Sequence, residues 1–215
     1  MVPLEDASHR ILAAAEQLFS EGGEDATSLR AITRQAGVNV AAIHYHFGGR
    51  DGLLRAILDR KIGPLNEHRL RLLDEVEARY GSRVPVDALL GAFLRPDLAL
   101  LESLRESGQF QFCRFMGRAY TEPSPAVAAF VDDQFAVVSQ RFMPLLAEAI
   151  PAVAASELQL RMRMVIAVIT VMFATATPPG QAGTSISEDI DGQLDHLVSF
   201  LAPGLAAPVT TRSHP

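Results

Sequence analysis

Apolar residues recur at intervals of three and four positions along almost the whole chain, and no segment alternates strictly between apolar and polar residues. The first spacing places side chains on one face of an α-helix, whereas alternation would indicate a half-buried β-strand. Hydrophobic residues make up 48% of the 215 residues and charged residues 20%, a balance that supports a buried core and argues against disorder. The sequence therefore predicts an all-α protein.

Capping residues and glycines mark the ends of the predicted helices. Serine, threonine, asparagine or aspartate favours a helix start, and glycine favours a helix end. Gly63-Pro64 lies inside the fourth predicted helix, where we expect a bend because the amphipathic pattern resumes beyond it. We predict helices over residues 6–22, 28–36, 39–46, 53–80, 86–104, 110–120, 126–150, 152–177 and 189–201.

The second and third predicted helices have the features of a helix-turn-helix, centred on residues 31–47. Such a motif needs small residues where its helices approach and a turn residue that tolerates positive φ, and Ala36-Gly37 supplies both. Ile32, Val38 and Ile43 can form the shared core. The outer face would then present small and polar groups to a DNA major groove. These groups are Asn39, Val40, Ala41, Ala42, His44 and Tyr45.

Local charge supports an anionic partner for this segment. The whole chain has a formal net charge of −6, yet residues 27–61 contain six basic and two acidic residues. A positive segment in a negative chain suggests nucleic acid, although chance variation on solvated helices is the alternative.

The residues on either side of the motif resemble those of the TetR family of one-component bacterial regulators. The resemblance covers about residues 8–60, with Phe-Ser-Glu-Gly-Gly before the motif and His-Tyr-His-Phe-Gly-Gly-Arg-Asp-Gly-Leu-Leu closing it. Two positions depart from the family pattern: Thr33 stands where alanine is usual, and Arg50 where lysine is common. Neither change removes the expected chemistry, because threonine is still small and arginine binds phosphate bidentately.

The resemblance implies a three-helix DNA-binding domain over residues 1–52 and a helical regulatory and dimerisation domain over residues 53–203, with residues 204–215 expected to be a disordered tail. It also assigns DNA contacts by position. Hydroxyl groups opening the second helix would hold phosphate, residues opening the third would face base edges, and those closing it would hold flanking phosphates. A core or capping role for His46 and a packing role for Tyr45 are the alternatives. The predicted contacts are Thr27, Ser28, Arg30, Asn39, Val40, Ala41, His44, Tyr45, His46 and Arg50.

The last two predicted helices fit a dimer interface. Residues 158–173 are apolar nearly all round, so this helix needs two packing partners, of which a second subunit would be one and the chain's own core the alternative. The family dimerises through its last two helices as a four-helix bundle. The predicted interface residues are Leu160, Met164, Val168, Met172, Leu194, Leu197, Val198 and Leu201.

An aromatic cluster in the second half predicts a pocket for a small apolar or aromatic ligand, with ordinary core packing as the alternative. The predicted lining is Phe112, Cys113, Phe115, Met116, Phe135 and Phe173. The apolar neighbours of Cys113 favour a buried, inert thiol over an oxidant sensor. The resemblance implies a repressor in which ligand binding moves the fourth helix and so changes the separation of the recognition helices, which must be about 34 Å to enter successive major grooves.

Other functions are disfavoured. No Gly-x-Ser-x-Gly motif, glycine-rich phosphate loop or paired Cys/His spacing occurs, so we expect neither an enzyme nor a cofactor or metal site. His44 and His46 are two apart and would point to opposite sides of a helix. Without a signal segment or a long apolar run, we expect a soluble, cytoplasmic protein that binds a palindromic double-stranded operator as a homodimer and contacts no membrane. A DNA-binding protein without a small-molecule effector and a helical module without DNA binding are the remaining alternatives.

Overall fold

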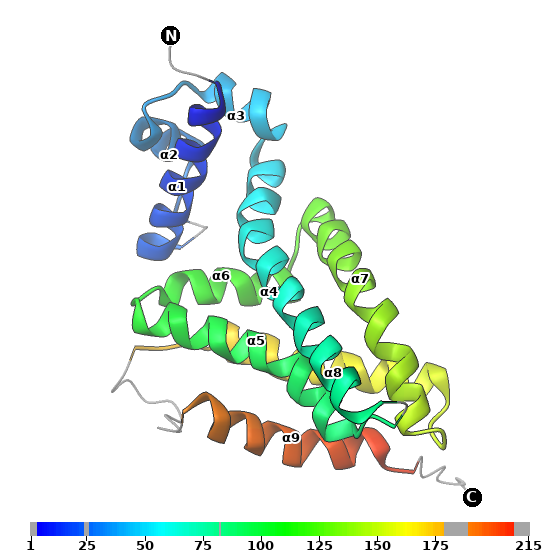
Figure 1. Cartoon of the computed structure of the whole chain (residues 1–215). Helices are drawn as coiled ribbons and strands as arrows, with labels where there is room; N and C mark the ends of the chain where they lie inside the picture. The colour runs from blue at the N-terminus through cyan, green and yellow to red at the C-terminus, as the bar shows by residue number, and fades with distance from the viewer. Residues whose placement is uncertain (1–3, 24–25, 82, 179–188, 209–215) are drawn as a thin grey trace, which may run out of the picture. The chain divides into compact units, whose positions relative to one another are not determined.

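The computed structural model describes residues 4–23, 26–81, 83–178 and 189–208, and every regular element in these ranges is an α-helix (Figure 1). The predicted all-α fold is therefore confirmed. The helices are α1 Leu4–Gly22, α2 Leu29–Ala36, α3 Val40–Phe47, α4 Arg50–Tyr80, α5 Val86–Glu106, α6 Phe110–Thr121, α7 Pro125–Ala149, α8 Ala155–Ala174 and α9 Ile190–Ala206.

The chain forms two compact units, and four of its helices contribute to both. The first unit comprises Met1–Pro64, Leu101–Phe135 and Thr170–Ser185, and the second comprises Leu65–Leu100, Ala136–Ile169 and Ile186–Pro215. The first unit therefore contains the predicted DNA-binding helices together with α6 and the start of α4.

The core of the first unit is built on one face of α1. Ile11, Ala15 and Phe19 are spaced at four residues and are buried, as the periodicity predicted. Phe19 packs on Phe115 of α6, with ring centroids 5.2 Å apart, and Phe115 packs in turn on Phe112 at 5.5 Å. Aromatic contacts thus attach α1, the first helix of the predicted DNA-binding domain, to α6.

In the second unit, a buried arginine connects α4 to α5. Arg69 donates from Nε to the carbonyl oxygen of Phe93 at 2.9 Å, and its guanidinium also binds the side chains of Asn66 and Asp97. The guanidinium carbon lies 4.5 Å from the centroid of the Phe93 ring. Burial raises the pKa of Asp97, and the charge and hydrogen bond of Arg69 oppose that shift. The pair holds two helices in one register, because its bonds are directional and shielded from water.

Four of the described helices continue through prolines: α4 at Pro64, α5 at Pro96, α7 at Pro144 and α9 at Pro203. Pro64 lies inside α4, which continues to Tyr80, and the predicted continuity of this helix is confirmed. Pro203 lies inside α9, which ends at Ala206 and not at Leu201 as predicted. Burial of Leu205 explains the extension, because packing of this side chain requires another helical turn. The first residues of the predicted tail are therefore helical, and residues 209–215 lie outside the described residues.

The buried pair gives a stability test. We expect Arg69→Met to lower the free energy of unfolding by about 3–5 kcal/mol, because it leaves the carboxyl of Asp97 buried without its partner. Combining it with Asp97→Leu should recover much of that loss. The matched control is Arg141→Met: Arg141 makes exposed ion pairs with Asp74 and Glu77 at 2.7 and 2.8 Å, and its loss should cost about 1 kcal/mol or less. Urea unfolding of the four proteins would measure these effects, and equal losses in both single variants would contradict the prediction.

Candidate DNA interface

The turn between α2 and α3 is closed by backbone hydrogen bonds. Gly37 has φ 64° and ψ 38°, a left-handed conformation that an L-residue rarely adopts. The Gly37 N–H donates to the carbonyl of Arg34 at 3.3 Å, and the Val38 N–H donates to that of Thr33 at 3.0 Å. This arrangement ends α2 and redirects the chain within two residues. It sets α3 against α2 as a helix-turn-helix requires.

Both helices of the motif begin at a side-chain cap. The hydroxyl of Ser28 accepts from the N–H of Ala31 at 3.1 Å, and the amide oxygen of Asn39 accepts from the N–H of Ala42 at 3.0 Å. Ser28 keeps its hydroxyl proton for donation to a phosphate. The cap uses one lone pair of the Asn39 amide oxygen, and the NH₂ group of Asn39 remains a donor for a base edge or a phosphate.

The outer face of α3 presents the side chains that the sequence predicted. Val40, Ala41, His44 and Tyr45 are exposed, with Tyr45 at 74% of its accessible surface, whereas Ile43 is fully buried beneath them. Of two further predicted contacts, Arg30 of α2 is exposed, and His46 of α3 is half-buried with its ring centroid 5.0 Å from that of Tyr45. Tyr45 is therefore the large side chain that α3 exposes most, and a helix such as α3 fits into a DNA major groove.

Thr27 was predicted as a phosphate contact, and the structure corrects this. Its side chain is 6% exposed, and its hydroxyl donates to the carbonyl of Gly23 at 2.8 Å. A second carbonyl, that of Leu18, lies 3.4 Å from the same oxygen. The hydroxyl therefore ties the end of α1 to the start of α2. The capping hydroxyl next to it, on Ser28, is the one that faces solvent.

Arg50, the predicted flanking phosphate contact, is half-buried and held by the chain itself. Its Nη1 donates to the carbonyl oxygen of Thr27 at 3.1 Å. The first residue of α4 is thereby connected to the loop that precedes α2. A guanidinium has five N–H donors, so a phosphate contact would share this side chain with the chain's own carbonyl. Sequence reasoning did not find this tether, because a carbonyl 23 residues away leaves no local pattern.

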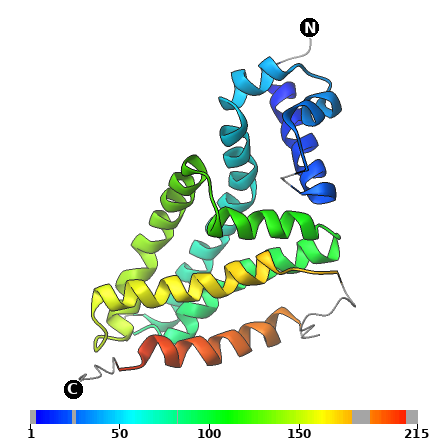
Figure 2. The same ribbon diagram turned by 180° about the vertical axis from the view of Figure 1, so that it is seen from behind.

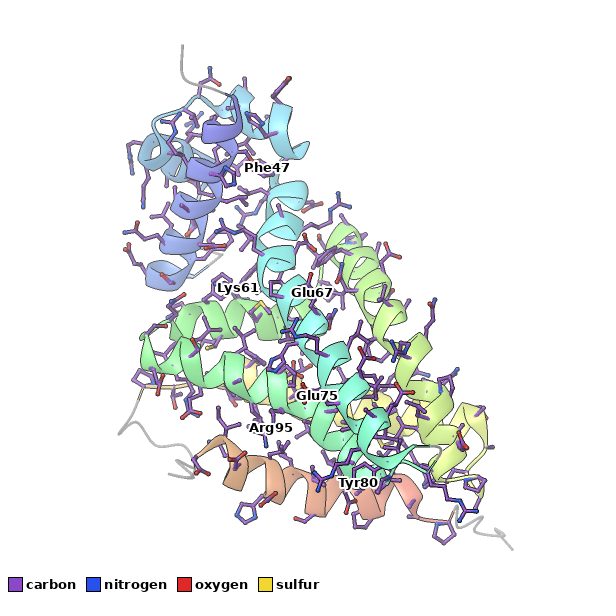
Figure 3. The ribbon with its side chains drawn as sticks, viewed as in Figure 1. Phe47, Lys61, Glu67, Glu75, Tyr80 and Arg95 are labelled. Atoms are coloured by element: carbon purple, nitrogen blue, oxygen red, sulfur yellow. The ribbon has the colours of Figure 1, made fainter. Side chains whose placement is uncertain are left out.

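The junction of α3 and α4 depends on a close backbone contact. A Cβ atom at Gly52 would overlap the carbonyl oxygen of Phe47, the last residue of α3. Figure 3 labels Phe47 at this junction, next to the first turn of α4. Glycine is required here by space, since its φ is not positive. The spacing of glycines 48, 49 and 52 was the available signal, and it indicated only a separation of helices.

The predicted pocket residues are packed within the first unit. Phe112, Cys113, Phe115, Met116 and Phe173 are buried, and Phe135 is half-buried. The ammonium of Lys61 lies 5.7 Å from the centroid of the Phe112 ring, which brings α4 to the same cluster. Burial raises the pKa of the Cys113 thiol to about 11, against the opposing charge of Arg105. The thiol is thus protonated near neutral pH, as expected of an inert cysteine.

Two cavities among the described residues lie elsewhere, both in the second unit. One has a volume of about 350 Å³ and lies beside Arg83 and the end of α7. The larger is a groove of about 550 Å³ between α4, α5 and α9, which we call the α5 groove. Figure 3 shows Glu75 and Tyr80 on α4 and Arg95 on α5, three of its lining residues. Its other lining residues are Leu72, Val76, Arg79, Ala88, Gly91, Ala92, Leu194 and Asp195.

The predicted dimer residues have different exposures. Leu160 and Met164 of α8 are exposed, at 44% and 58%, and four more are half-buried: Val168, Met172, Leu197 and Val198. Leu194 and Leu201 of α9 are buried in their own chain, so we withdraw them from the interface. Phe200 is 76% exposed and was missed, because the apolar stripe on α9 was read from Leu194 and Leu201, the side that faces inward.

Across the residues that the structure describes, no group of three or more His, Cys, Asp or Glu side chains is arranged to hold a metal ion. None of the described helices has the length and hydropathy needed to cross a bilayer.

Comparison with known families identifies this arrangement. The model described as "Bacterial regulatory proteins, tetR family" matches residues 11–57, and the one described as "Tetracyclin repressor-like, C-terminal domain" matches residues 91–204. The two matches cover the helix-turn-helix and more than half of the chain. The fold and the motif define a helix-turn-helix transcription regulator. The chain belongs to the TetR family.

Individual relatives match over part of their length. The chain is 34% identical over 110 residues to the HTH-type transcriptional repressor Rv3405c of Mycobacterium tuberculosis, covering 50% of this chain and 53% of that protein. It is 29% identical over 123 residues to the HTH-type transcriptional dual regulator CecR of Shigella flexneri, covering 57% and 55%. The chain thus spans about half the length of the curated relatives it matches.

Solved structures share the fold over nearly the whole chain. The TetR family transcriptional regulator PfmR from Thermus thermophilus superposes with a TM-score of 0.58 at 17% identity, covering 94% of this chain and 99% of that one. A transcriptional regulator from Rhodococcus sp. Rha1 superposes with a TM-score of 0.60 at 21% identity, again covering 94% and 99%. At these identities the likeness concerns the fold alone.

The helix junction gives a prediction for the interface. Gly52→Ala should displace the end of α3, because the added methyl overlaps the carbonyl of Phe47, and should lower the free energy of unfolding by about 1–3 kcal/mol. Gly63→Ala is the matched control on the same helix, where the nearest atom to an added Cβ is a carboxylate oxygen of Asp59 at 3.9 Å. Denaturant unfolding, with DNA binding measured in parallel, tests this. If Gly52→Ala is as stable as the control variant, the junction does not depend on glycine.

Proposed function

We propose that this protein is a homodimeric repressor that binds a palindromic operator through α3 and releases it when a small molecule binds the helical region beyond residue 53. The observation that carries the DNA-binding part is the exposed face of α3, set by the Gly37 turn and led by Tyr45. A two-fold dimer places two such helices in successive major grooves about 34 Å apart, which is why the operator would be palindromic. A regulator of this kind acts in the cytoplasm, where the chromosome is.

Contacts to DNA are divided between two surfaces. Val40 and Ala41, at the start of α3, would pack against thymine methyl groups, and Tyr45 and His44 would reach bases or the backbone. On the flanks, the Ser28 hydroxyl and the guanidinium of Arg50 would hold phosphates, together with the exposed guanidinium of Arg30. His46 supports Tyr45 through the ring contact at 5.0 Å. Few charged groups take part, so specificity would rest on α3 and on the dimer spacing.

Repression and ligand release are each supported by a separate observation. The relative Rv3405c is named a repressor, which favours that mode of action. For the ligand, the α5 groove has a volume of about 550 Å³, within the range of about 300–1,000 Å³ of small-molecule sites. Its lining combines small residues with charged side chains, a mixture that would suit an amphipathic molecule. The buried aromatic cluster around Phe112 is the other candidate, and a regulator without an effector is the alternative to both.

Operator binding is tested in two steps. Selection from a random double-stranded pool should yield a palindromic site for the wild-type protein. On that site, Tyr45→Ala should weaken binding by roughly tenfold or more, because the most exposed aromatic side chain of the proposed contact face is removed. Tyr80→Ala is the matched control, a half-exposed tyrosine on α4 in the second unit. Fluorescence anisotropy measures both, with circular dichroism confirming the fold. If the two variants bind the operator with equal affinity, α3 does not recognise DNA through Tyr45. That result would favour the alternative of a helical module without DNA binding.

Ligand control is tested by filling the α5 groove. A Cβ at Gly91 would meet no atom within 4 Å, so Gly91→Leu should occupy the groove without displacing its walls. We expect a panel of amphipathic small molecules to contain compounds that release operator from the wild-type protein and fail to release it from Gly91→Leu. If the same compounds release operator from both the wild-type protein and Gly91→Leu, the ligand site would instead be the aromatic cluster around Phe112. If no compound releases operator from either, the effector-free alternative is favoured.

A further inference from the structure

Arg161, on α8, is a buried charged side chain that DNA binding does not use. It is 9% exposed, and its Nη1 donates to the carbonyl oxygens of Leu205 at 2.7 Å and Ala207 at 2.6 Å. A third carbonyl, of Gly204, lies 3.3 Å from the same nitrogen. Its Nε donates to the carboxylate of Glu157, one turn earlier on α8, at 2.8 Å. One guanidinium therefore joins the start of α8 to the end of α9.

Within the residues that the structure describes, no left-handed cap closes the end of α9. The last turn contains no basic residue, and the C-cap, Ala207, has φ −59° and ψ 139° and not the left-handed conformation that closes many helices. The last carbonyls of a helix lack intrahelical donors and carry partial negative charge. Arg161 supplies both the missing donors and a positive charge from a neighbouring helix.

Three of the four exposed large apolar side chains of this helix pair lie near the Arg161 contact, and the fourth, Val171, lies further along α8. Leu160 is adjacent to Arg161 on α8, Met164 is one turn further on, and Phe200 of α9 is one turn before Gly204. Because the start of α8 is bonded to the end of α9, the two helices run antiparallel, and Figure 2 shows them side by side. In this register Met164 lies within about one turn of the level of Phe200, and Leu160 lies near the level of Ala206. The guanidinium fixes the relative position of the two helices that carry these side chains.

We propose that Arg161 is a positioning residue for self-association: it holds the end of α9 against α8, so that Leu160, Met164 and Phe200 form a single apolar surface for a second copy of this chain. The inference rests on the homodimer proposed above. Large apolar side chains exposed together are costly in water and mark association surfaces. An interface made from two helices keeps its shape only if the helices cannot slide, which hydrogen bonds to three backbone carbonyls prevent.

The test measures the dimer dissociation constant by sedimentation equilibrium. Arg161→Met keeps the apolar stem and removes every donor, and it should raise the dissociation constant roughly tenfold or more. Arg161→Lys keeps the charge and some of the donors and should lie between Arg161→Met and the wild type. Phe200→Glu, which alters the proposed surface directly, should leave only monomer at micromolar concentration. Arg141→Met, an exposed arginine of the same unit, should match the wild type.

A second measurement separates positioning from general stability. Backbone amide exchange should quicken in residues 200–206 of Arg161→Met and stay unchanged in α3 and α4. If Phe200→Glu remains dimeric, the proposed dimer surface is wrong. If Phe200→Glu dissociates while Arg161→Met and Arg161→Lys dimerise as tightly as the wild type, the role assigned to Arg161 is wrong. If Arg161→Met fails to fold, Arg161→Lys is the deciding variant. The positioning role of Arg161 would then be wrong if Arg161→Lys dimerises as tightly as the wild type while amide exchange at the end of α9 is faster.

Discussion

The close approach of Gly52 to the carbonyl of Phe47 determines how the recognition helix is presented. At this point α3 ends and α4 begins, so any side chain larger than hydrogen would push the two helices apart. The bond from Arg50 to the carbonyl of Thr27 secures the same junction from the other side. Together they make the first turn of α4 part of the DNA-binding unit. The face of α3 is therefore oriented by α4 as much as by α2, and displacement of α4 would change that orientation directly.

Buried polar side chains connect helices at three places, and each ends on backbone carbonyls. Thr27 binds the end of α1, Arg69 binds α5 at Phe93, and Arg161 binds the end of α9. A buried guanidinium is costly unless its donors are used, so these contacts favour one alignment of the helices over others of equal hydrophobic burial. Apolar packing alone tolerates sliding between helices. The directional bonds supply the register that a regulator built only of helices needs.

Local patterns predicted local structure well. Ser28, Asn39 and Gly37 mark the caps and the turn of the motif, because capping and positive φ depend on neighbours within three residues. Burial of the Thr27 hydroxyl disfavours its predicted contact with DNA. Two adjacent hydroxyls look alike in sequence, and only packing decides which is buried. Likewise, periodicity identified an apolar stripe on α9 but not what covers it, so Leu194 and Leu201 were misassigned. Arg69 and Arg161 were not found, since their partners lie far away along the chain.

Cys113 has a practical consequence. It is the one cysteine in the chain, it is fully buried, and its thiol remains protonated near neutral pH. A cysteine introduced at an exposed position of α3 would be the only thiol open to a spin label. Two labels in a dimer would then report the separation of the two α3 helices, with and without DNA, as a distance measured by pulsed electron paramagnetic resonance. No native thiol would have to be removed first.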